Sequence, residues 1–419
     1  MHVEGVTMTT EPQVLELRDV DPFAPEHRAD PYPLYERLRA EAPIWYHPRF
    51  DEFVLTRHAD CESVLRDPRW STDAENLDPS RRDADDVRLA MGDLKAGVLL
   101  FLDPPDHTRL RRLVSKAFTP RSIERLRPHV QDLVDSILVG TVLDELRDAG
   151  EVDLMASIAY PLPVTVICEL LGVPLDDRHR FAAWSSDASR LLDGEIEGDV
   201  LERGIVAAMN FISYFDGLFE ERRKAPRDDL VSALLAAEDE GDRLSEAELR
   251  SIVLLLFVAG HETTMNLIGN GMWALLAHPD QQRRLEADPS LVPNAVEEML
   301  RYDGPVHLTG RIAREDLDVG GLRVPRGGQV STLLAAANRD PDRFPEPARF
   351  DVARDDLHHL TFSGGIHYCL GAALARLEGQ VVVGSLVGRF PGLELVTRHP
   401  QHRDHFILRG LKELRVAVG

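Results

Sequence analysis

The chain is poor in cysteine and has no long apolar stretch near its N-terminus. Its three cysteines, Cys61, Cys168 and Cys369, form neither a disulfide framework nor a C-x-x-C pair. This pattern argues against a secreted disulfide scaffold and a zinc ribbon, and favours a reducing compartment. Residues 1–21 are polar and acidic, without a signal peptide or a run of about 20 apolar residues. We therefore expect a cytoplasmic protein without a membrane anchor.

Positive charge is also scarce. The 48 lysine and arginine residues are outnumbered by 71 aspartate and glutamate residues, which gives a net charge of −23. Such a surface repels phosphate backbones and anionic lipid headgroups, so nucleic acid and membranes are not expected as partners. The 419 residues, 43% of them hydrophobic, are enough to bury a large core.

Apolar spacing along the chain predicts mostly helices, and no repeat or single linker interrupts it. Helices are expected at Pro33–Ala42, Asp106–Ala117, Val130–Leu146, Val164–Leu171, Asp177–Leu192, Leu201–Lys224, Asp229–Ala237, Ser245–Leu276 and Pro293–Tyr302. Strands are expected at Ile44–Tyr46, Phe53–Thr56, Leu308–Ile312, Leu317–Val324 and Gln329–Leu333. The proline-rich segment 338–361 is predicted to be irregular. The expected fold is mainly α with a small β portion, arranged as a tail at 1–20 and one domain at 21–419.

The most informative segment is a glycine-rich loop, F-S-G-G-I-H-Y-C-L-G, from Phe362 to Gly371. It places Cys369 just before a helix-like run, Ala372–Glu378, whose N-terminal N–H groups favour a thiolate. The loop glycines leave room for a flat macrocycle near the backbone, and Phe362 is expected to pack beneath the sulfur. A buried cysteine beside an ordinary turn is the alternative, but the string F-x-x-G-x-H-x-C-x-G is far rarer by chance.

This string resembles the haem-ligand signature of the cytochrome P-450 family, and the resemblance extends from about residue 20 to the end of the chain. It implies a haem b cofactor (iron protoporphyrin IX), with Cys369 as the axial ligand of the iron and His367 as a donor to a haem propionate. Many members have glycine where Ser363 stands. A thiolate axial ligand favours O–O cleavage, so the resemblance implies oxygen activation rather than oxygen storage.

The longest predicted helix opens with a capping box, Ser245-x-x-Glu248, and lacks proline up to about Leu276. An unbroken apolar run, Ile252–Ala259, predicts a central, buried position. Gly260 follows this run, at a cost of about 1 kcal/mol relative to alanine in a helix interior, which indicates that space is needed there.

The next residues, A-G-H-E-T-T at 259–264, resemble the oxygen-binding groove of the family. The resemblance implies that Thr263 hydrogen-bonds dioxygen and that Glu262 delivers protons from solvent. A threonine bonded to a backbone carbonyl beside a surface glutamate is the alternative for the same residues. His261 is expected to be a packing or surface residue.

A further motif, E-x-x-R, places Glu298 and Arg301 three residues apart on a predicted helix, a spacing that permits an ion pair. Alone this motif is weak in so charged a chain. The resemblance adds Arg349, from P-A-R-F, and implies a buried structural triad that holds the cysteine loop.

Two basic residues, His107 and Arg111, stand four apart and would share a helix face. The resemblance places them on the haem propionates together with Arg311, because arginine suits carboxylate binding. A solvated basic helix start is the alternative. The complete set of implied haem contacts is His107, Arg111, Ala259, Gly260, Arg311, Phe362, Gly365, His367, Cys369 and Gly371.

The substrate pocket is specified only by resemblance. Its implied wall residues are Leu94, Val98, Leu255, Val258, His307, Leu308, Phe406 and Ile407. A mostly apolar wall predicts a hydrophobic small molecule oriented by shape more than by charge. His307 is expected either to orient a substrate hydroxyl or carbonyl or to be an ordinary packing residue.

The resemblance implies a haem-thiolate monooxygenase that hydroxylates or epoxidises such a molecule with O2. Electrons from NAD(P)H are expected through a ferredoxin and its ferredoxin reductase, because the chain has no flavin domain or iron–sulfur cysteine set. Arg109, Arg112 and Arg376 are predicted to form a basic docking patch for the ferredoxin. The alternatives are a haem-thiolate sensor without turnover and a peroxide-using or aryl-coupling oxidase. The segment 259–282 is most similar to actinobacterial hydroxylases of macrolides, terpenoids or steroid-like compounds.

Overall fold

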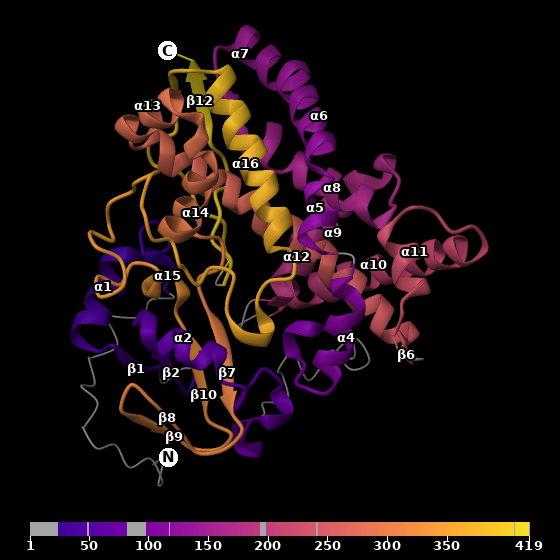
Figure 1. The fold of residues 1–419 in the computed structure, drawn as a ribbon, viewed down its shortest axis with the longest axis vertical. Helices are drawn as coiled ribbons and strands as arrows, with labels where there is room; N and C mark the ends of the chain where they lie inside the picture. Colours follow the sequence, from indigo (N-terminus) through magenta and orange to yellow (C-terminus); the bar gives the residue numbers. More distant parts are fainter. Residues whose placement is uncertain are drawn as a thin grey trace.

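The computed structural model describes residues 24–47, 50–81, 98–116, 118–192, 198–239, 242–405 and 407–418. Helices make up most of it, and the larger sheet lies to one side, next to α1 (Tyr32–Glu41) and α2 (His58–Arg66), as Figure 1 shows. The expected class, mainly α with a small β portion, is confirmed. The tail at 1–20 lies outside the described residues, and its separation from a single domain stays a prediction.

The other helices follow in chain order. They are α4 (Asp106–Ser115), α5 (Pro120–Glu124), α6 (Arg127–Ile137), α7 (Leu143–Ala149), α8 (Pro161–Leu171), α9 (Arg178–Ser189), α10 (Asp199–Lys224), α11 (Leu230–Ala236), α12 (Glu246–Leu276), α13 (Pro279–Ala287), α14 (Val292–Asp303), α15 (Leu334–Ala337) and α16 (Ala372–Arg389). The helix expected at Val130–Leu146 is in fact α6 and α7, joined by a π turn at Leu138–Val142.

Five strands form the larger sheet, in the order β1 (Ile44–His47), β2 (Glu52–Leu55), β10 (Gln329–Thr332), β7 (Thr309–Ala313) and β3 (Trp70–Ser71). The β2–β10 pair is parallel and the other pairs are antiparallel. Smaller sheets contain β4 (Val152–Asp153), β5 (Glu238–Asp239), β6 (Asp242–Arg243), β8 (Leu317–Val319), β9 (Leu322–Val324), β11 (Leu393–Leu395) and β12 (Arg415–Val418).

The prediction of a single strand at Leu317–Val324 is wrong. The segment is a hairpin, β8 and β9, because Gly320 and Gly321 adopt positive φ angles of 55° and 87° and reverse the chain.

The central helix α12 has the predicted capping box: the Ser245 side chain accepts from the Glu248 backbone N–H, and the Glu248 carboxylate accepts from Ser245. Its 31 residues pack against α8, α14 and α16. Among the described helices, only α12 is long and apolar enough to cross a membrane, and 72% of its most apolar 18-residue stretch is buried within the fold. Such burial is what the core helix of a globular protein shows.

Candidate functional site

The cysteine loop is held by its own backbone. The Cys369 N–H donates to the carbonyl of Phe362 at 2.9 Å, and α16 begins three residues after the cysteine. Phe362 is buried, with the Arg376 guanidinium 4.5 Å from the centre of its ring. The loop thus folds back on itself and presents a single partly buried sulfur at the start of α16.

The electrostatics of this sulfur have opposing causes. Burial raises the pKa of the Cys369 thiol, while the backbone N–H groups of Gly371 and Ala372 and the charges of Arg111 and Arg376 lower it. The net direction is upward, so the helix start alone does not make a thiolate here. A coordinated metal ion deprotonates such a thiol outright, and the same N–H groups then stabilise the anionic sulfur.

Two loop glycines have different surroundings. Gly365 has a φ of +63°, and a Cβ there would lie 2.3 Å from the carbonyl oxygen of Leu65 in α2. The backbone conformation and the approach of α2 therefore already require this glycine, and its contact with a haem stays a prediction. A Cβ on Gly371 would meet no atom within 4 Å among the described residues, so Gly371 does border open space.

A group of basic side chains surrounds this loop. The rings of His107 and His367 lie 4.4 Å apart, and Nε2 of His367 is 3.2 Å from Thr72 Oγ1. Arg111 donates to the Tyr368 carbonyl at 2.6 Å. Four of these groups were predicted propionate contacts, namely His107, Arg111, Arg311 and His367, and they come from α4, β7 and the cysteine loop.

These basic groups are short of acidic partners. Arg311 bonds only neutral oxygens among the described residues, including Thr309 Oγ1 at 3.0 Å. Burial lowers the pKa of Arg311 to about 10. The pKa of His367 is lowered to about 3, mainly by burial and secondly by the charge of Arg311. Nε2 of His107 is buried and has no hydrogen-bond partner in the described structure. Two carboxylates would satisfy this set of donors, which is the requirement of haem propionates.

The open face of α12 carries a stripe at intervals of four residues. Leu255, Ala259 and Thr263 are partly exposed, as are their neighbours Leu254, Leu256 and Gly260, whereas Val258 is buried. The hydroxyl of Thr263 donates to the Ala259 carbonyl at 2.7 Å, as in the alternative structural reading of this motif. Thr263 is nevertheless partly exposed, on the same face of α12 as Ala259 and Leu255.

The structure gives Gly260 a packing role, and its role in leaving space for oxygen stays a prediction. A Cβ at this position would lie 3.3 Å from Cδ1 of Ile167 in α8. The missing side chain therefore allows Ile167 of α8 to pack closely against α12.

The Glu262 side chain is buried rather than exposed. Its Oε1 accepts from Nη1 of Arg403 at 2.6 Å, and Oε2 lies 3.5 Å from Nε2 of His261. Burial would raise the pKa of Glu262, but the His261 hydrogen bond and the Arg403 charge lower it overall, so the group is ionised. His261 is a packing residue, as expected, because its ring contacts Ser185 at 2.9 Å and the Phe257 carbonyl at 3.0 Å. The sequence offered no signal for Arg403, which is 141 residues from Glu262.

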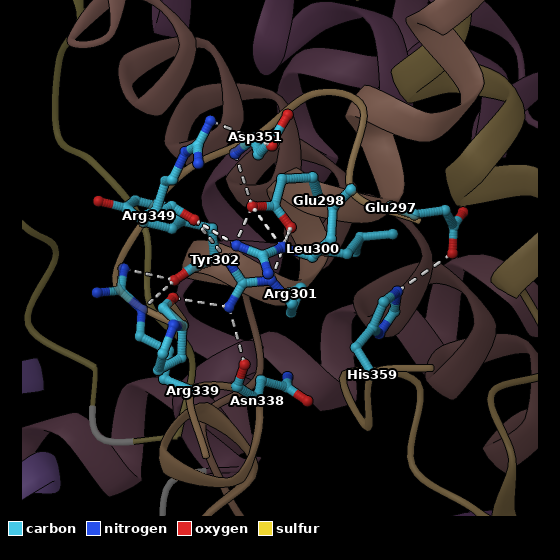
Figure 2. Close-up of polar contacts among 12 residues, drawn as sticks. Glu297, Glu298, Leu300, Arg301, Tyr302, Asn338, Arg339, Arg349, Asp351 and His359 are labelled. Atoms are coloured by element: carbon cyan, nitrogen blue, oxygen red, sulfur yellow. Dashed lines mark hydrogen bonds and ion pairs between the residues drawn. The ribbon is translucent and has the colours of Figure 1, made fainter. Parts of the chain in front are cut away.

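Glu298 and Arg301 form the expected buried pair, with bonds of 2.7 and 2.8 Å. The third member is not the Arg349 side chain. Figure 2 shows the Arg349 guanidinium turned toward Asp351, 3.6 Å away, and its carbonyl accepting from Arg301. Arg354 instead places Nε 3.2 Å from Glu298 and donates to three backbone carbonyls. The prediction of Arg349 as the third member was wrong, because the direction of the backbone decides which of two arginines five residues apart reaches Glu298. The motif F-D-x-x-R, which ends at Arg354, was the sequence signal that could have identified it.

The predicted pocket residues outside α12 are described only in part. Leu94 and Phe406 fall outside the described residues. Val98 is buried in the loop before a 3-10 turn, and Leu308 and Ile407 pack with α1 and β1 residues. The His307 ring is buried between Tyr32 and Tyr35, with Nδ1 3.2 Å from the Tyr35 hydroxyl, so it faces α1.

Two arginines of the predicted docking patch are paired with carboxylates. Arg109 is bonded to Glu248, and Arg376 binds Glu297 through two bonds of 2.6 and 2.8 Å. Arg112 is exposed. The face beside the cysteine also exposes the apolar side chains Ile366 and Tyr368.

Comparison with known proteins places these features in a family. The model of the family described as "Cytochrome P450" matches residues 72–415. The chain belongs to the cytochrome P450 family. It is 44% identical over 406 residues to vitamin D(3) 25-hydroxylase of Pseudonocardia autotrophica, covering 95% of this chain and 96% of that protein. It is 45% identical over 415 residues to the cytochrome P450 monooxygenase PikC of Streptomyces venezuelae, covering 97% and 95%.

A solved P450 structure has a similar fold. P450BioI, in complex with an acyl carrier protein ligated to hexadec-9Z-enoic acid, superposes with a TM-score of 0.86 at 36% identity, over 94% of this chain and 99% of that one. The expectations of family, fold, haem b cofactor and enzyme class are thereby confirmed: this P450 is a haem-thiolate monooxygenase, an oxidoreductase that incorporates oxygen.

Proposed function

We propose that this P450 inserts one atom of dioxygen into a C–H bond, or across a double bond, of a largely hydrophobic small molecule in the cytoplasm. NAD(P)H would supply the electrons through a ferredoxin reductase and a ferredoxin, since the chain has no cysteine set for an iron–sulfur cluster. The Thr263 hydroxyl on the open stripe of α12, next to the buried Glu262 carboxylate, carries this proposal.

The haem would be held by the groups assembled around the cysteine loop. Cys369 would bind the iron. The guanidinium groups of Arg111 and Arg311 and the N–H donors of His107 and His367 would bind the propionates. When bound, the haem supplies the redox chemistry that activates dioxygen.

The residues of α12 would manage protons. The Thr263 hydroxyl donates a hydrogen bond to the Ala259 carbonyl. Its oxygen can still accept a hydrogen bond from a group on the partly exposed side of the helix. Glu262 is an ionised acceptor held by Arg403, which is itself partly exposed to solvent. Release of Glu262 from Arg403 would let it carry a proton inward as a general acid–base relay.

A Thr263→Ala variant tests the function. It should retain haem and substrate and still consume NAD(P)H, but divert the electrons to hydrogen peroxide, because proton placement is lost while electron supply is not. A Glu262→Gln variant should slow turnover instead. Unchanged coupling in the first variant and unchanged turnover in the second would shift the assignment to a sensor or a peroxide-using oxidase. Thr264→Ala is the matched control, because Thr264 is the next threonine of α12 and its buried hydroxyl donates to the Gly260 carbonyl at 3.0 Å.

The redox partner would dock over the cysteine loop. Because Arg109 and Arg376 are paired with carboxylates, we expect this contact to rest largely on the exposed side chains Ile366 and Tyr368, and Arg112, which is exposed, stays a predicted contact. Apolar contacts depend little on salt, so we expect reduction by ferredoxin to depend less on salt than it would with a wholly basic docking patch.

A further inference from the structure

A second charged group lies beside the cysteine loop, next to the pair formed by Glu298 and Arg301. Glu297 on α14 accepts from Arg376 on α16 through two bonds of 2.6 and 2.8 Å. Its Oε2 also lies 3.2 Å from Nε2 of His359, and Figure 2 shows this contact apart from the contacts around Glu298. The group therefore ties α14 and α16 to the segment that leads into the cysteine loop.

The Arg376 guanidinium also holds two aromatic side chains of this loop. Its central carbon lies 4.5 Å from the centre of the Phe362 ring, and Nη1 donates to the Tyr368 hydroxyl at 3.1 Å. Phe362 is 8% exposed, and its ring lies 5.8 Å from that of His359. A cation over the face of a buried ring is attracted to the ring electrons. Arg376 therefore fixes the position of Phe362.

Phe362 and the cysteine belong to one hydrogen-bonded turn. The Phe362 carbonyl accepts from the Cys369 N–H at 2.9 Å, so a shift of one residue moves the other. The charge of Arg376 also reaches the sulfur. Burial raises the pKa of the Cys369 thiol, and the charge of Arg376 is among the causes that oppose this rise.

The polarity of the Glu297–Arg376 pair is defined by its contacts. Burial raises the pKa of Glu297, but the hydrogen bonds from His359 and Arg376 lower it to about 2 overall, so the carboxylate is ionised at pH 7. The positive member of the pair is the one that contacts Phe362 and Tyr368. The cysteine loop thus has a fixed cation against it, held from behind by a carboxylate through two bonds.

We propose that Arg376 is a positioning residue for reduction of the haem iron: it holds Phe362 in place and sets a positive charge beside the Cys369 sulfur, which raises the reduction potential of the iron. Reduction adds one electron to the haem and its ligand, so a nearby cation favours the reduced state. The inference rests on the proposed ligation by Cys369. It gives Arg376 a role that requires no contact with the ferredoxin.

The test measures the reduction potential of the haem-loaded full chain by spectroelectrochemical titration with mediator dyes and without a redox partner. Arg376→Met should lower the ferrous-to-ferric ratio at a fixed potential by about threefold or more, which corresponds to about 28 mV for a one-electron couple. Arg376→Lys should recover more than half of this shift, because the positive charge is kept. Glu297→Gln should shift the potential in the opposite direction, because a negative charge is removed, and this variant tests the inference even where Arg376→Met loses haem.

The matched control is Arg389→Met. Arg389 lies on the same helix, about 20 Å further along it, and is likewise paired with a carboxylate, that of Asp135. Its replacement removes the same charge without touching the cysteine loop, so the potential should stay at the wild-type value.

Three results would overturn the inference. They are equal potentials in Arg376→Met and Arg389→Met, the same potential in Arg376→Lys as in Arg376→Met, and a shift in Glu297→Gln in the direction of Arg376→Met. The Soret band of the reduced carbon monoxide complex reports ligation by Cys369 separately. A wild type without the red-shifted band would refute the proposed function and this inference together, whereas the band with an unchanged potential in Arg376→Met would refute the inference alone.

Discussion

Replacing Arg354 should destabilise this P450 far more than replacing Arg349, which reverses the expectation drawn from the sequence. The Arg354 side chain is 11% exposed and reaches Glu298 and three backbone carbonyls, at Pro345, Glu346 and Arg349. The Arg349 side chain is 54% exposed, and its charged partners among the described residues are Glu346 and Asp351, at 3.4 and 3.6 Å.

The size of the effect follows from burial. Removing one partner of a buried, hydrogen-bonded ion pair costs about 3–5 kcal/mol, whereas an exposed pair contributes about 0–1 kcal/mol. With an unfolding entropy of about 2.1 cal/mol/K per residue, the chain's 419 residues give about 0.9 kcal/mol/K. Arg354→Met should therefore lower Tm by about 3–6 °C, and Arg349→Met by about 1 °C or less.

Differential scanning calorimetry of the haem-loaded variants measures these shifts, at one scan rate because unfolding of so large a chain need not be reversible. Haem content should fall in Arg354→Met and not in Arg349→Met, since Glu298 also accepts from the Asp351 backbone N–H in the segment that leads to the cysteine loop. Equal shifts in the two variants, or a larger one for Arg349→Met, would refute the assignment of Arg354.

Three further predictions concern single side chains. Cys369→Ser should abolish the red-shifted Soret band of the reduced carbon monoxide complex, while Cys61→Ser and Cys168→Ser, at buried positions, should retain it; an unchanged spectrum in the first would remove Cys369 as the ligand. Burial raises the pKa of Glu378 to about 8, so between about pH 4.5 and 8 the folded chain holds a proton that the unfolded chain has lost, and the free energy of unfolding should fall as pH rises through this range. Glu378→Gln should flatten this pH dependence and raise the urea midpoint at pH 8. A variant whose stability still fell as steeply with pH would contradict the role of Glu378. Arg112→Glu should slow reduction by ferredoxin about two- to fivefold at low salt, and no change in stopped-flow rates would exclude Arg112 from the docking face.

The sequence was most informative where the determinants are local. The capping box of α12, the Glu298–Arg301 pair and the cysteine loop all depend on residues within ten positions of one another, and the structure has each of them. Partners that come from distant parts of the chain were not predictable. Arg403 reaches Glu262 across 141 residues, and His307 lies against α1, 272 residues before it at Tyr35. The sequence shows which donors, acceptors and charges these side chains carry, but it does not show which side chains from distant parts of the chain lie next to them.

Glycine shows this limit most clearly and yields a last prediction. An absent side chain signals that something approaches closely, without saying what: for Gly260 it is Ile167, and for Gly365 it is the Leu65 carbonyl. Gly371 has no such neighbour and a φ of −84°, so alanine fits there in the absence of a cofactor. Gly371→Ala should thus fold normally in the haem-free state, judged by circular dichroism, yet bind haem more weakly, whereas Gly365→Ala should lose folded protein. Unaltered haem affinity in Gly371→Ala would mean that the open space beside this glycine is not the surface on which the macrocycle lies.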